Sequence, residues 1–156
     1  MKILGICGKK RSGKDTAGEY LIENYGYVRY AFGDPVKDVC RVMFKFTEEQ
    51  LYGDKKEIID PRWGISPRQA FQKIGTDFGQ EALHKIIPDI TGEVRSRQFW
   101  TKHFELWFKE KLQTNPNIKV VITDVRFKHE AKMINNLGGS IIKIKRDGLP
   151  KDNHIS

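Results

Sequence analysis

The residues best suited to chemistry lie near the start of the chain, in the stretch 8–16, which reads GKKRSGKDT. The spacing G-x-x-x-x-G-K is typical of a loop that binds phosphate between a strand and a helix. Glycines permit the tight bend that turns backbone N–H groups toward an anion, and the helix N-terminus adds partial positive charge. The alternative is a basic turn without a ligand. An apolar strand pattern at 2–7 precedes the loop, and this order favours nucleotide binding.

Charged residues within this loop have separate expected tasks. Lys14 is expected to reach the β- and γ-phosphate oxygens of a nucleotide. Three neighbouring cations, Lys9, Lys10 and Arg11, add positive charge. Asp15 stands where such loops commonly carry a serine or threonine that binds Mg²⁺. A carboxylate beside polyphosphate needs a compensating charge, so we expect Asp15 to hold Mg²⁺ or to orient a substrate. The alternative is that Asp15 only stabilises the first helical turn.

A second candidate site follows the predicted strand 118–123. Asp124 and Arg126 come directly after it, and ligands of open α/β sheets bind at the carboxyl ends of strands. Asp124 is expected to hold Mg²⁺ through water, and Arg126 to neutralise charge on a transferring phosphoryl group. The alternative is an Asp–Arg ion pair that fixes the loop.

The elements that position these residues follow from the sequence pattern. Four β-branched or aromatic segments, at 2–7, 27–32, 118–123 and 140–145, are predicted strands. The runs KVVIT and SIIKI are expected to have little exposed face. Helical patterns alternate with the strands, so we predict an α/β three-layer sandwich with a mostly parallel central sheet. After Asp34-Pro35, four apolar residues recur on one helix face: Val36, Val39, Met43 and Phe46.

The middle of the chain is predicted to be helical. A capping box at Ser66 begins a helix whose polar face, with Arg68, Gln72 and Gly75, is either a binding surface or an ordinary solvent face. The charged stretch 54–64 is a candidate moving flap or a plain surface loop. The aromatic stripe within 99–112 is more typical of a core than of a base-stacking platform.

Composition narrows the class of protein. The chain has 156 residues, 38% hydrophobic, enough for one globular domain. It has no apolar run of membrane-spanning length and no signal peptide, so a cytoplasmic protein is expected, in the host cytoplasm for a phage protein. Two cysteines do not form a disulfide framework, and four histidines lack ligand spacing. The net charge of +8 suits a nucleotide; nucleic acid is not expected as a partner, because RNA-binding signatures are missing.

Four ordered motifs give the chain a family resemblance. GKKRSGKDT at 8–16, FGDPVKD at 32–38, SPRQAFQKIGTDFGQ at 66–80 and VITDVRFKHEA at 121–131 resemble the phage-type deoxynucleoside monophosphate kinases. The resemblance covers nearly the whole chain. It implies one P-loop NTPase domain, 1–156, of the nucleoside monophosphate kinase type, with an acceptor-binding helical insert at about 47–114. It also implies transfer of the γ-phosphoryl group of ATP, with Mg²⁺, to a deoxynucleoside monophosphate. A homodimer remains open.

The resemblance also assigns roles to individual residues. ATP phosphate would be bound by Gly8, Arg11, Ser12, Gly13, Lys14 and Thr16. The catalytic residues would be Lys14, Asp15 and Arg126, and the metal ligands Asp15 and Asp124. The monophosphate acceptor would be bound by Arg68, Gln72, Asp77, Trp100 and Glu130. Arg68 is the candidate for a bidentate phosphate contact.

The chain departs from the family pattern in two places. Gln80 stands where many members carry a basic residue, which puts one phosphate or base contact in question. The family pattern continues past Ser156 with a further strand and helix that help to build the ATP base pocket. We therefore expect either a naturally short member or a truncated one, with activity reduced.

Three other functions fit parts of the sequence. A non-catalytic ATP-binding module would bind ATP without transferring phosphate. A P-loop kinase for another small phosphate ester would use the same loop, because the loop does not name its acceptor. A basic nucleic-acid-binding protein would show steeply salt-dependent affinity in which Lys14 is dispensable.

Overall fold

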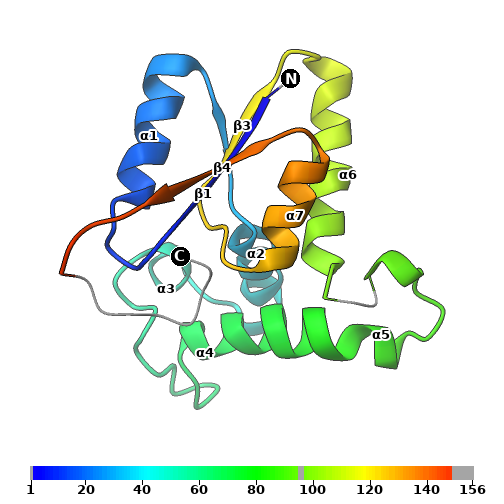
Figure 1. Cartoon of the computed structure of the whole chain (residues 1–156). Helices are drawn as coiled ribbons and strands as arrows, with labels where there is room; N and C mark the ends of the chain where they lie inside the picture. The colour runs from blue at the N-terminus through cyan, green and yellow to red at the C-terminus, as the bar shows by residue number, and fades with distance from the viewer. Residues whose placement is uncertain (1, 95–96, 149–156) are drawn as a thin grey trace. The chain divides into compact units, whose positions relative to one another are not determined.

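A computed structural model describes residues 2–94 and 97–148 (Figure 1). Its strands are β1 (Lys2–Gly8), β2 (Val28–Tyr30), β3 (Lys119–Ile122) and β4 (Ser140–Ile144). Its longer α-helices are α1 (Lys14–Tyr25), α2 (Gly33–Phe44), α6 (Phe99–Thr114) and α7 (Lys128–Asn136). The shorter helices are α3 (Glu48–Tyr52), α4 (Pro67–Gln72), the π-helix η1 (Lys73–Ala82), α5 (Leu83–Ile86) and the 3₁₀ helix η2 (Gly92–Val94).

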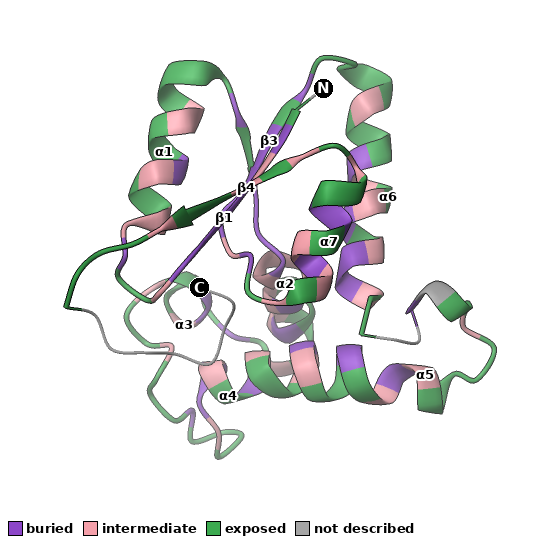
Figure 2. Ribbon diagram, viewed as in Figure 1, coloured by how far each residue is buried: buried purple, intermediate pink, exposed green. Residues whose placement is uncertain are grey.

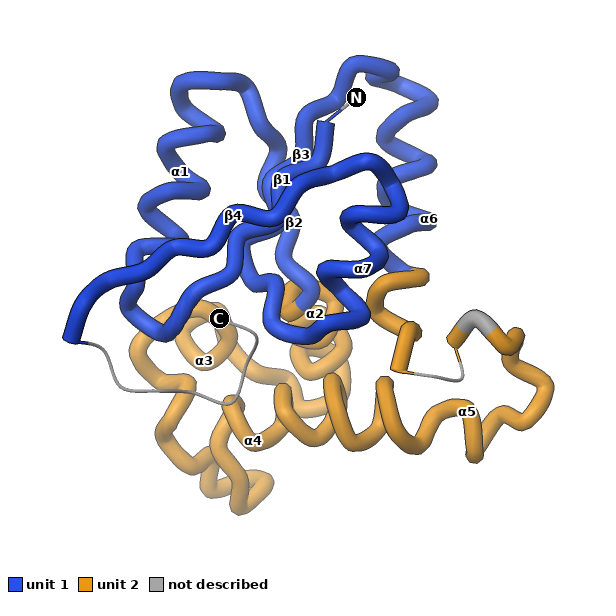
Figure 3. Tube along the Cα trace, viewed as in Figure 1, with its two compact units in different colours: residues 1–32, 103–156 blue, residues 33–102 orange. Residues whose placement is uncertain are grey.

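The chain divides into two compact units, shown in different colours in Figure 3. Unit 1 contains residues 1–32 and 103–156, and unit 2 contains residues 33–102. One boundary falls inside α6. The acceptor-binding insert expected at about 47–114 does not coincide with either compact unit. Its role in binding the acceptor stays a prediction.

Unit 1 is a parallel sheet between helices. The strand order is β2-β3-β1-β4, and every neighbouring pair is parallel. Figure 1 shows α1 on one side of this sheet and α6 and α7 on the other. The predicted three-layer α/β sandwich of the P-loop kinase type is confirmed. Because parallel strands point the same way, all four carboxyl ends lie at one edge of the sheet.

The two faces of the sheet have separate cores, because successive strand residues point to opposite faces. Ile3 of β1 and Val120 of β3 belong to a cluster with Phe104 and Phe108 of α6. The opposite face carries a smaller cluster that packs against α1: Ile6, Tyr27 and Val121, with Leu4, Ala17, Leu21, Ile22 and Ile144 beside them. Phe104 and Phe108 are fully buried, so the prediction that the aromatic stripe is core is confirmed for these residues.

The predicted burial of the strands is right for β3 and wrong for β4. The last three residues of β3 are buried, as expected for a central strand (Figure 2). In β4 no residue is buried, because within the described residues it pairs with β1 alone and forms an edge of the sheet. A run such as SIIKI has the same apolar composition in either place, so its sequence does not distinguish an edge strand from a central one.

Unit 2 has its own core, to which α2 contributes one narrow face. Val36 and Cys40 of α2 are buried together with Phe46, Leu51 and Ala70. Val39 and Met43, which the apolar pattern placed beside Val36, are exposed by 37% and 51%. Cys40 takes the buried position at i+4 from Val36, and burial raises the pKa of its thiol to about 11.

Helix α4 begins at the predicted capping box and continues into the π-helix η1. The hydroxyl of Ser66 accepts a hydrogen bond from the N–H of Gln69 at 3.2 Å, and the Gln69 side chain accepts one from the N–H of Ser66 at 2.8 Å. The wider turns of η1 change which residues share a face: Phe71 and Ile74 pack against the core of unit 2, whereas Phe78 is exposed.

Gly75 has a packing role rather than the predicted ligand contact. A Cβ at this position would lie 3.3 Å from the Val36 side chain, so α2 occupies the space beside Gly75. The Gly75 carbonyl also accepts a hydrogen bond from Trp100 Nε1 at 2.8 Å. The close approach that this glycine permits is therefore that of protein atoms.

Within the described residues, no helix combines the length and the apolar character that a membrane span requires.

Candidate active site

The phosphate loop joins the end of β1 at Gly8 to the start of α1 at Lys14. The N–H of Ser12 donates to the Lys9 carbonyl at 3.0 Å and closes the turn. Gly13 is the N-cap of α1, with φ 102°, a conformation that glycine adopts without the strain of a side chain. Arg11 has φ 62°, so two residues of this short loop are left-handed. The predicted strand–loop–helix geometry is confirmed.

Neighbouring atoms leave no room for a side chain at Gly8. A Cβ at this position would lie 2.6 Å from Ser12 Oγ and 2.7 Å from the carbonyl oxygen of Ile144 in β4. The backbone carbonyl cannot move aside without breaking the pairing of β1 with β4. The first glycine of the motif thus allows the loop to fold back against the end of the sheet.

The side-chain hydroxyl of Ser12 lacks a hydrogen-bond partner within the described part of the chain. The Ser12 side chain is also buried. A buried hydroxyl without a partner costs about 1–3 kcal/mol. Located between Gly8 and Gly13 beside the N-terminus of α1, this hydroxyl suits a phosphate oxygen as its partner.

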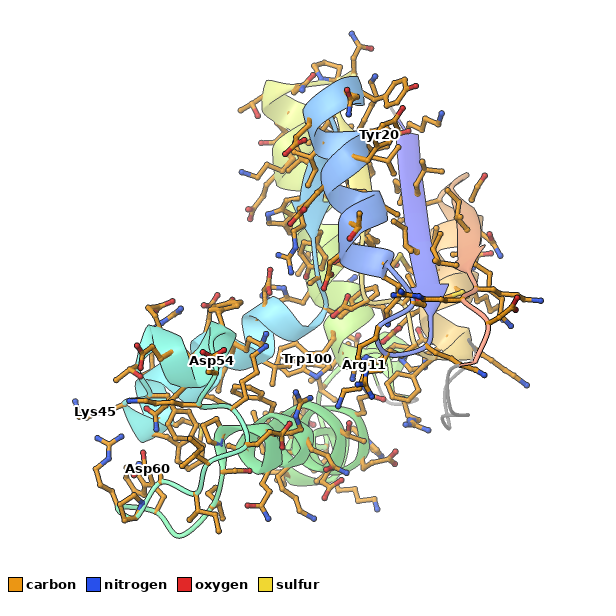
Figure 4. The ribbon with its side chains drawn as sticks, turned by 90° about the vertical axis from the view of Figure 1, so that its left-hand side faces the viewer. Arg11, Tyr20, Lys45, Asp54, Asp60 and Trp100 are labelled. Atoms are coloured by element: carbon orange, nitrogen blue, oxygen red, sulfur yellow. The ribbon has the colours of Figure 1, made fainter. Side chains whose placement is uncertain are left out.

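The other predicted phosphate-binding side chains are more open to solvent. Arg11, Asp15 and Thr16 are exposed, and Lys14 is half-buried. Figure 4 shows Arg11 at the loop end of α1. Cationic side chains around a loop that ends in a helix N-terminus make this end of unit 1 attractive to a polyanion.

Asp124 lies at the same edge of the sheet, directly after β3 and Thr123. Its Oδ1 accepts a hydrogen bond from the N–H of Phe32 at 2.8 Å, which fixes the carboxylate at the end of β2. The N–H of Thr123 donates to the Tyr30 carbonyl at 3.2 Å and extends the pairing of β2 with β3. Parallel strands thus bring Asp124 and the phosphate loop to one edge, as the sequence predicts.

Glu130 holds the loop that carries Arg126. Its Oε2 accepts hydrogen bonds from the N–H groups of Arg126, at 2.7 Å, and Phe127, at 3.1 Å. Phe127 is the N-cap of α7 and Glu130 is its third helical residue, so the carboxylate closes the start of the helix. Burial raises the pKa of Glu130 to about 7, and the negative charge of Asp124 contributes in the same direction. These contacts explain the D-x-R-x-x-x-E spacing structurally; acceptor binding by Glu130 stays a prediction.

In unit 2, Arg68 already has an anionic partner. Its Nε forms a short ion pair with the carboxylate of Glu57, and its backbone N–H donates to the Lys56 carbonyl at 3.0 Å. Both side chains are partly exposed. A guanidinium that binds one carboxylate in this way presents the fork that a phosphate would also take. Gln72, one turn further along α4, is exposed.

The remaining predicted acceptor residues have local partners. Asp77 forms an exposed i, i+4 ion pair with Lys73 at 2.9 Å. Trp100 is 9% exposed and belongs to the core of unit 2. Gln80 is buried, and its Oε1 accepts a hydrogen bond from Arg97 Nε at 3.1 Å. Arg97 therefore brings a positive charge beside position 80, where it also pairs with the carboxylate of Glu81 at 3.1 Å. Substrate contacts of Asp77 and Trp100 stay predictions.

The segment 54–64, a candidate flap, is anchored at its carboxyl-terminal end. The carboxylate of Asp60 accepts hydrogen bonds from Gln50 Nε2 at 2.9 Å and Arg62 Nη2 at 2.7 Å. The hydrogen bond from Arg62 contributes most, and together these bonds hold the pKa of Asp60 well below its usual range. Trp63 Nε1 donates to the Phe44 carbonyl at 2.8 Å. Closure of the segment as a whole therefore stays a prediction that these contacts oppose.

The carboxylates of unit 1 fit a Mg²⁺ ion that is shared with a nucleotide. The described residues contain no group of three histidine, cysteine or acidic side chains that could hold a metal alone. Magnesium sites of kinases commonly use one or two carboxylates, water and the phosphate oxygens themselves. Asp124, fixed by the N–H of Phe32, and Asp15, in the first turn of α1, supply oxygens of this kind.

Comparison with known proteins decides the family. A family model described as deoxynucleotide monophosphate kinase matches residues 2–60 and 49–156. The chain belongs to the deoxynucleotide monophosphate kinase family. It is therefore an enzyme of the phosphotransferase class.

Three viral proteins are similar to this kinase. It is 41% identical to a predicted deoxynucleotide monophosphate kinase of Acanthamoeba polyphaga mimivirus, over 97% of this chain and 78% of the relative. It is 24% identical to the deoxynucleotide monophosphate kinase of Enterobacteria phage T4, over the whole chain and 86% of the relative. The corresponding protein of Escherichia phage RB69 is 22% identical, with 87% of its length covered.

Two features of the kinase site were not found from its sequence. The sequence did not indicate that Glu57 pairs with Arg68, because the two residues are separated by a loop without regular periodicity. The hydrogen bond between Phe32 and Asp124 joins residues 92 positions apart, and only the parallel pairing of β2 with β3 brings them together.

Proposed function

We propose that this kinase transfers the γ-phosphoryl group of ATP to a deoxynucleoside monophosphate and releases the diphosphate and ADP. The observation that carries the donor site is the buried Ser12 hydroxyl without a partner, inside a loop bounded by Gly8 and Gly13. A β- or γ-phosphate oxygen would accept its hydrogen bond, together with those of the loop N–H groups and Lys14. The family membership supports the same reaction.

The side chains at the edge of the sheet would act on the reacting phosphate by charge and position. Catalysis of phosphoryl transfer depends mainly on aligning the substrates and on stabilising the charge of the transferred group. Lys14 would bind the donor oxygens, and Arg126 would offset negative charge in the transition state. Asp15 and Asp124 would hold Mg²⁺ through water, and the ion would supply further neutralisation of the phosphate charge. Glu130 positions the Arg126 backbone through its two hydrogen bonds.

Arg68 would bind the phosphate of the acceptor. Its present partner, the Glu57 carboxylate, contacts the guanidinium at Nε, and a phosphate monoester would bind the guanidinium through two nitrogens and carries more charge. The acceptor would therefore displace Glu57 from the guanidinium. Gln72, exposed one turn away, would contribute a hydrogen bond to the same substrate.

The test is ADP release in a coupled assay with ATP, Mg²⁺ and each deoxynucleoside monophosphate in turn. Turnover that requires a particular monophosphate and disappears in Lys14→Ala supports the proposal and identifies the acceptors. ATP binding without ADP release across the panel would instead indicate a non-catalytic ATP-binding module. ADP release with a different phosphate ester would indicate a kinase of another substrate.

A further inference from the structure

A pocket away from the candidate active site lies in unit 1, at the amino ends of β1 and β3. It has a volume of about 620 Å³ and is formed by the starts of β1 and β3 and the last turns of α1. Figure 4 shows Tyr20, on its rim, at the end of α1 opposite to Arg11 and the phosphate loop. The pocket is therefore separated from the candidate active site by the length of α1 and of the sheet.

Two lysines stand side by side at this pocket. Lys2 of β1 and Lys119 of β3 are register partners in neighbouring parallel strands, and both line the pocket. Like charges at directly opposite positions of a sheet destabilise it. Of the described residues that line the pocket, none is acidic. An anion bound between the two ammonium groups would relieve this repulsion.

Aromatic rings form the wall next to the lysines. The pocket is lined by Tyr20, Tyr25 and Tyr27, and the rings of Tyr20 and Tyr25 meet edge to face with centroids 5.8 Å apart. Tyr20 and Tyr25 are 56% and 52% exposed. Exposed tyrosine rings that are already ordered by a neighbour offer a stacking surface at low entropic cost.

One feature opposes an anion here, and Lys119 offsets it. The C-terminal end of α1 carries partial negative charge. Lys119 Nζ donates to the Tyr25 carbonyl at that end at 2.7 Å and lies 5.6 Å from the centroid of the Tyr27 ring. The ammonium is thus fixed in the pocket wall while it neutralises the helix end. Lys2, on the neighbouring strand, is exposed and contributes its full charge.

From this combination we propose that the pocket binds a nucleoside phosphate at a site separate from the phosphate loop. The base stacks on one of the rings of Tyr20 and Tyr25 and meets the other at an angle, and its polar edge meets the amide of Asn117, which also lines the pocket. The phosphate lies between Lys2 and Lys119. The volume is that of a small-molecule site. The site does not depend on the proposed kinase reaction, because all of these residues lie away from the catalytic edge of the sheet.

The experiment is a titration of the isotope-labelled full chain with dTMP, followed through the backbone amide signals in NMR spectra. We expect saturable shifts at Tyr20, Tyr25 and Lys119 that persist in Lys14→Ala, which separates this site from the donor site. In Lys2→Gln/Lys119→Gln the affinity should fall about tenfold or more, because two charged phosphate contacts are lost. The matched control Lys109→Gln/Lys132→Gln, which removes the same charge from exposed positions of α6 and α7, should leave the affinity unchanged.

Separate titrations with thymidine and with ribose 5-phosphate test the two halves of the ligand. Each half should bind more weakly than dTMP. The proposal is wrong if dTMP causes no shifts at the pocket, if ribose 5-phosphate binds as tightly as dTMP, or if the control variant weakens binding as much as the pocket variant does. A dispersed amide spectrum for each variant establishes that it is folded. Lys2→Gln alone leaves the bond from Lys119 to the Tyr25 carbonyl intact, and its affinity for dTMP should also be lower than that of the unchanged chain.

Discussion

At the scale of single residues, Ser12 and Glu130 occupy positions whose chemistry is unusual for their surroundings. One is a buried hydroxyl without a partner, and the other is a buried carboxylate with a raised pKa. Both lie in unit 1 near the carboxyl edge of the sheet. Local structure is commonly strained at functional sites, and each of the two residues gives a test of its own.

Replacing Ser12 with alanine should separate folding from binding. Without a ligand, removal of the unpaired hydroxyl should leave the free energy of unfolding unchanged or raise it by about 1 kcal/mol. ATP affinity should fall about fivefold or more, because the hydrogen bond to a phosphate is lost. Urea denaturation and calorimetric titration measure the two quantities. A loss of stability without a loss of affinity would show that Ser12 is structural.

Glu130 should make stability depend on pH. Its pKa is raised from 4.5 to about 7, so the folded chain binds more protons than the unfolded chain between these values. Its contribution to stability is therefore largest at low pH and declines as pH rises through this window, by on the order of 2 kcal/mol. Glu130→Gln should remove this decline between pH 5 and 7.5, whereas the exposed control Glu110→Gln should retain it. Urea denaturation gives the free energy of unfolding at each pH. If this free energy changes with pH equally in the unchanged chain, Glu130→Gln and Glu110→Gln, the raised pKa of Glu130 is wrong.

At the scale of elements, the donor residues of unit 1 and the predicted acceptor residues of unit 2 depend on different structures. The donor side is built at the ends of β1 and β3, where strand direction alone brings Asp124 and the phosphate loop to one edge. The predicted acceptor side lies on α4 and η1, which pack closely at Gly75 and Gly79 and carry Arg68 in contact with Glu57.

The contact between Glu57 and Arg68 should compete with the acceptor. Glu57→Gln removes the competing charge, so the KM for the monophosphate should fall severalfold while kcat stays similar. Arg68→Ala should raise the same KM. Glu49→Gln, which removes an equally exposed carboxylate paired with Lys55, is the matched control. An unchanged KM in both Glu57→Gln and Arg68→Ala would show that the acceptor binds elsewhere.

Gly79 should be intolerant of a side chain. A Cβ there would lie 2.6 Å from Nε1 of Trp100 and 2.9 Å from a carbon of the same ring. Gly79→Ala should therefore displace the indole and destabilise the chain by about 1–3 kcal/mol. Gly92→Ala, where the added Cβ would have no atom within 4 Å among the described residues beyond its own stretch of chain, should cost little. Thermal unfolding measures both, and equal melting temperatures would contradict the packing of η1 on Trp100.

At the scale of the whole molecule, the sequence predicted the parts that depend on local pattern. The glycine spacing of 8–16 predicted the turn between β1 and α1, and alternating strands and helices predicted the sandwich. The sequence did not reveal that β4 is an edge strand or that residues 73–82 form a π-helix. Both depend on tertiary neighbours rather than on composition. The sequence also left open whether the face with Gly75 binds a ligand, because a glycine in a sequence does not show which atoms approach it.

The central claim is that the phosphate loop delivers the γ-phosphoryl group of ATP to a deoxynucleoside monophosphate. The most direct measurement is to incubate the chain with ATP labelled in its γ-phosphate, Mg²⁺ and each monophosphate, and to separate the nucleotides. We predict label in the deoxynucleoside diphosphate, and none in that product with Lys14→Ala. Label that stays in ATP or appears only as inorganic phosphate with every acceptor would contradict the claim.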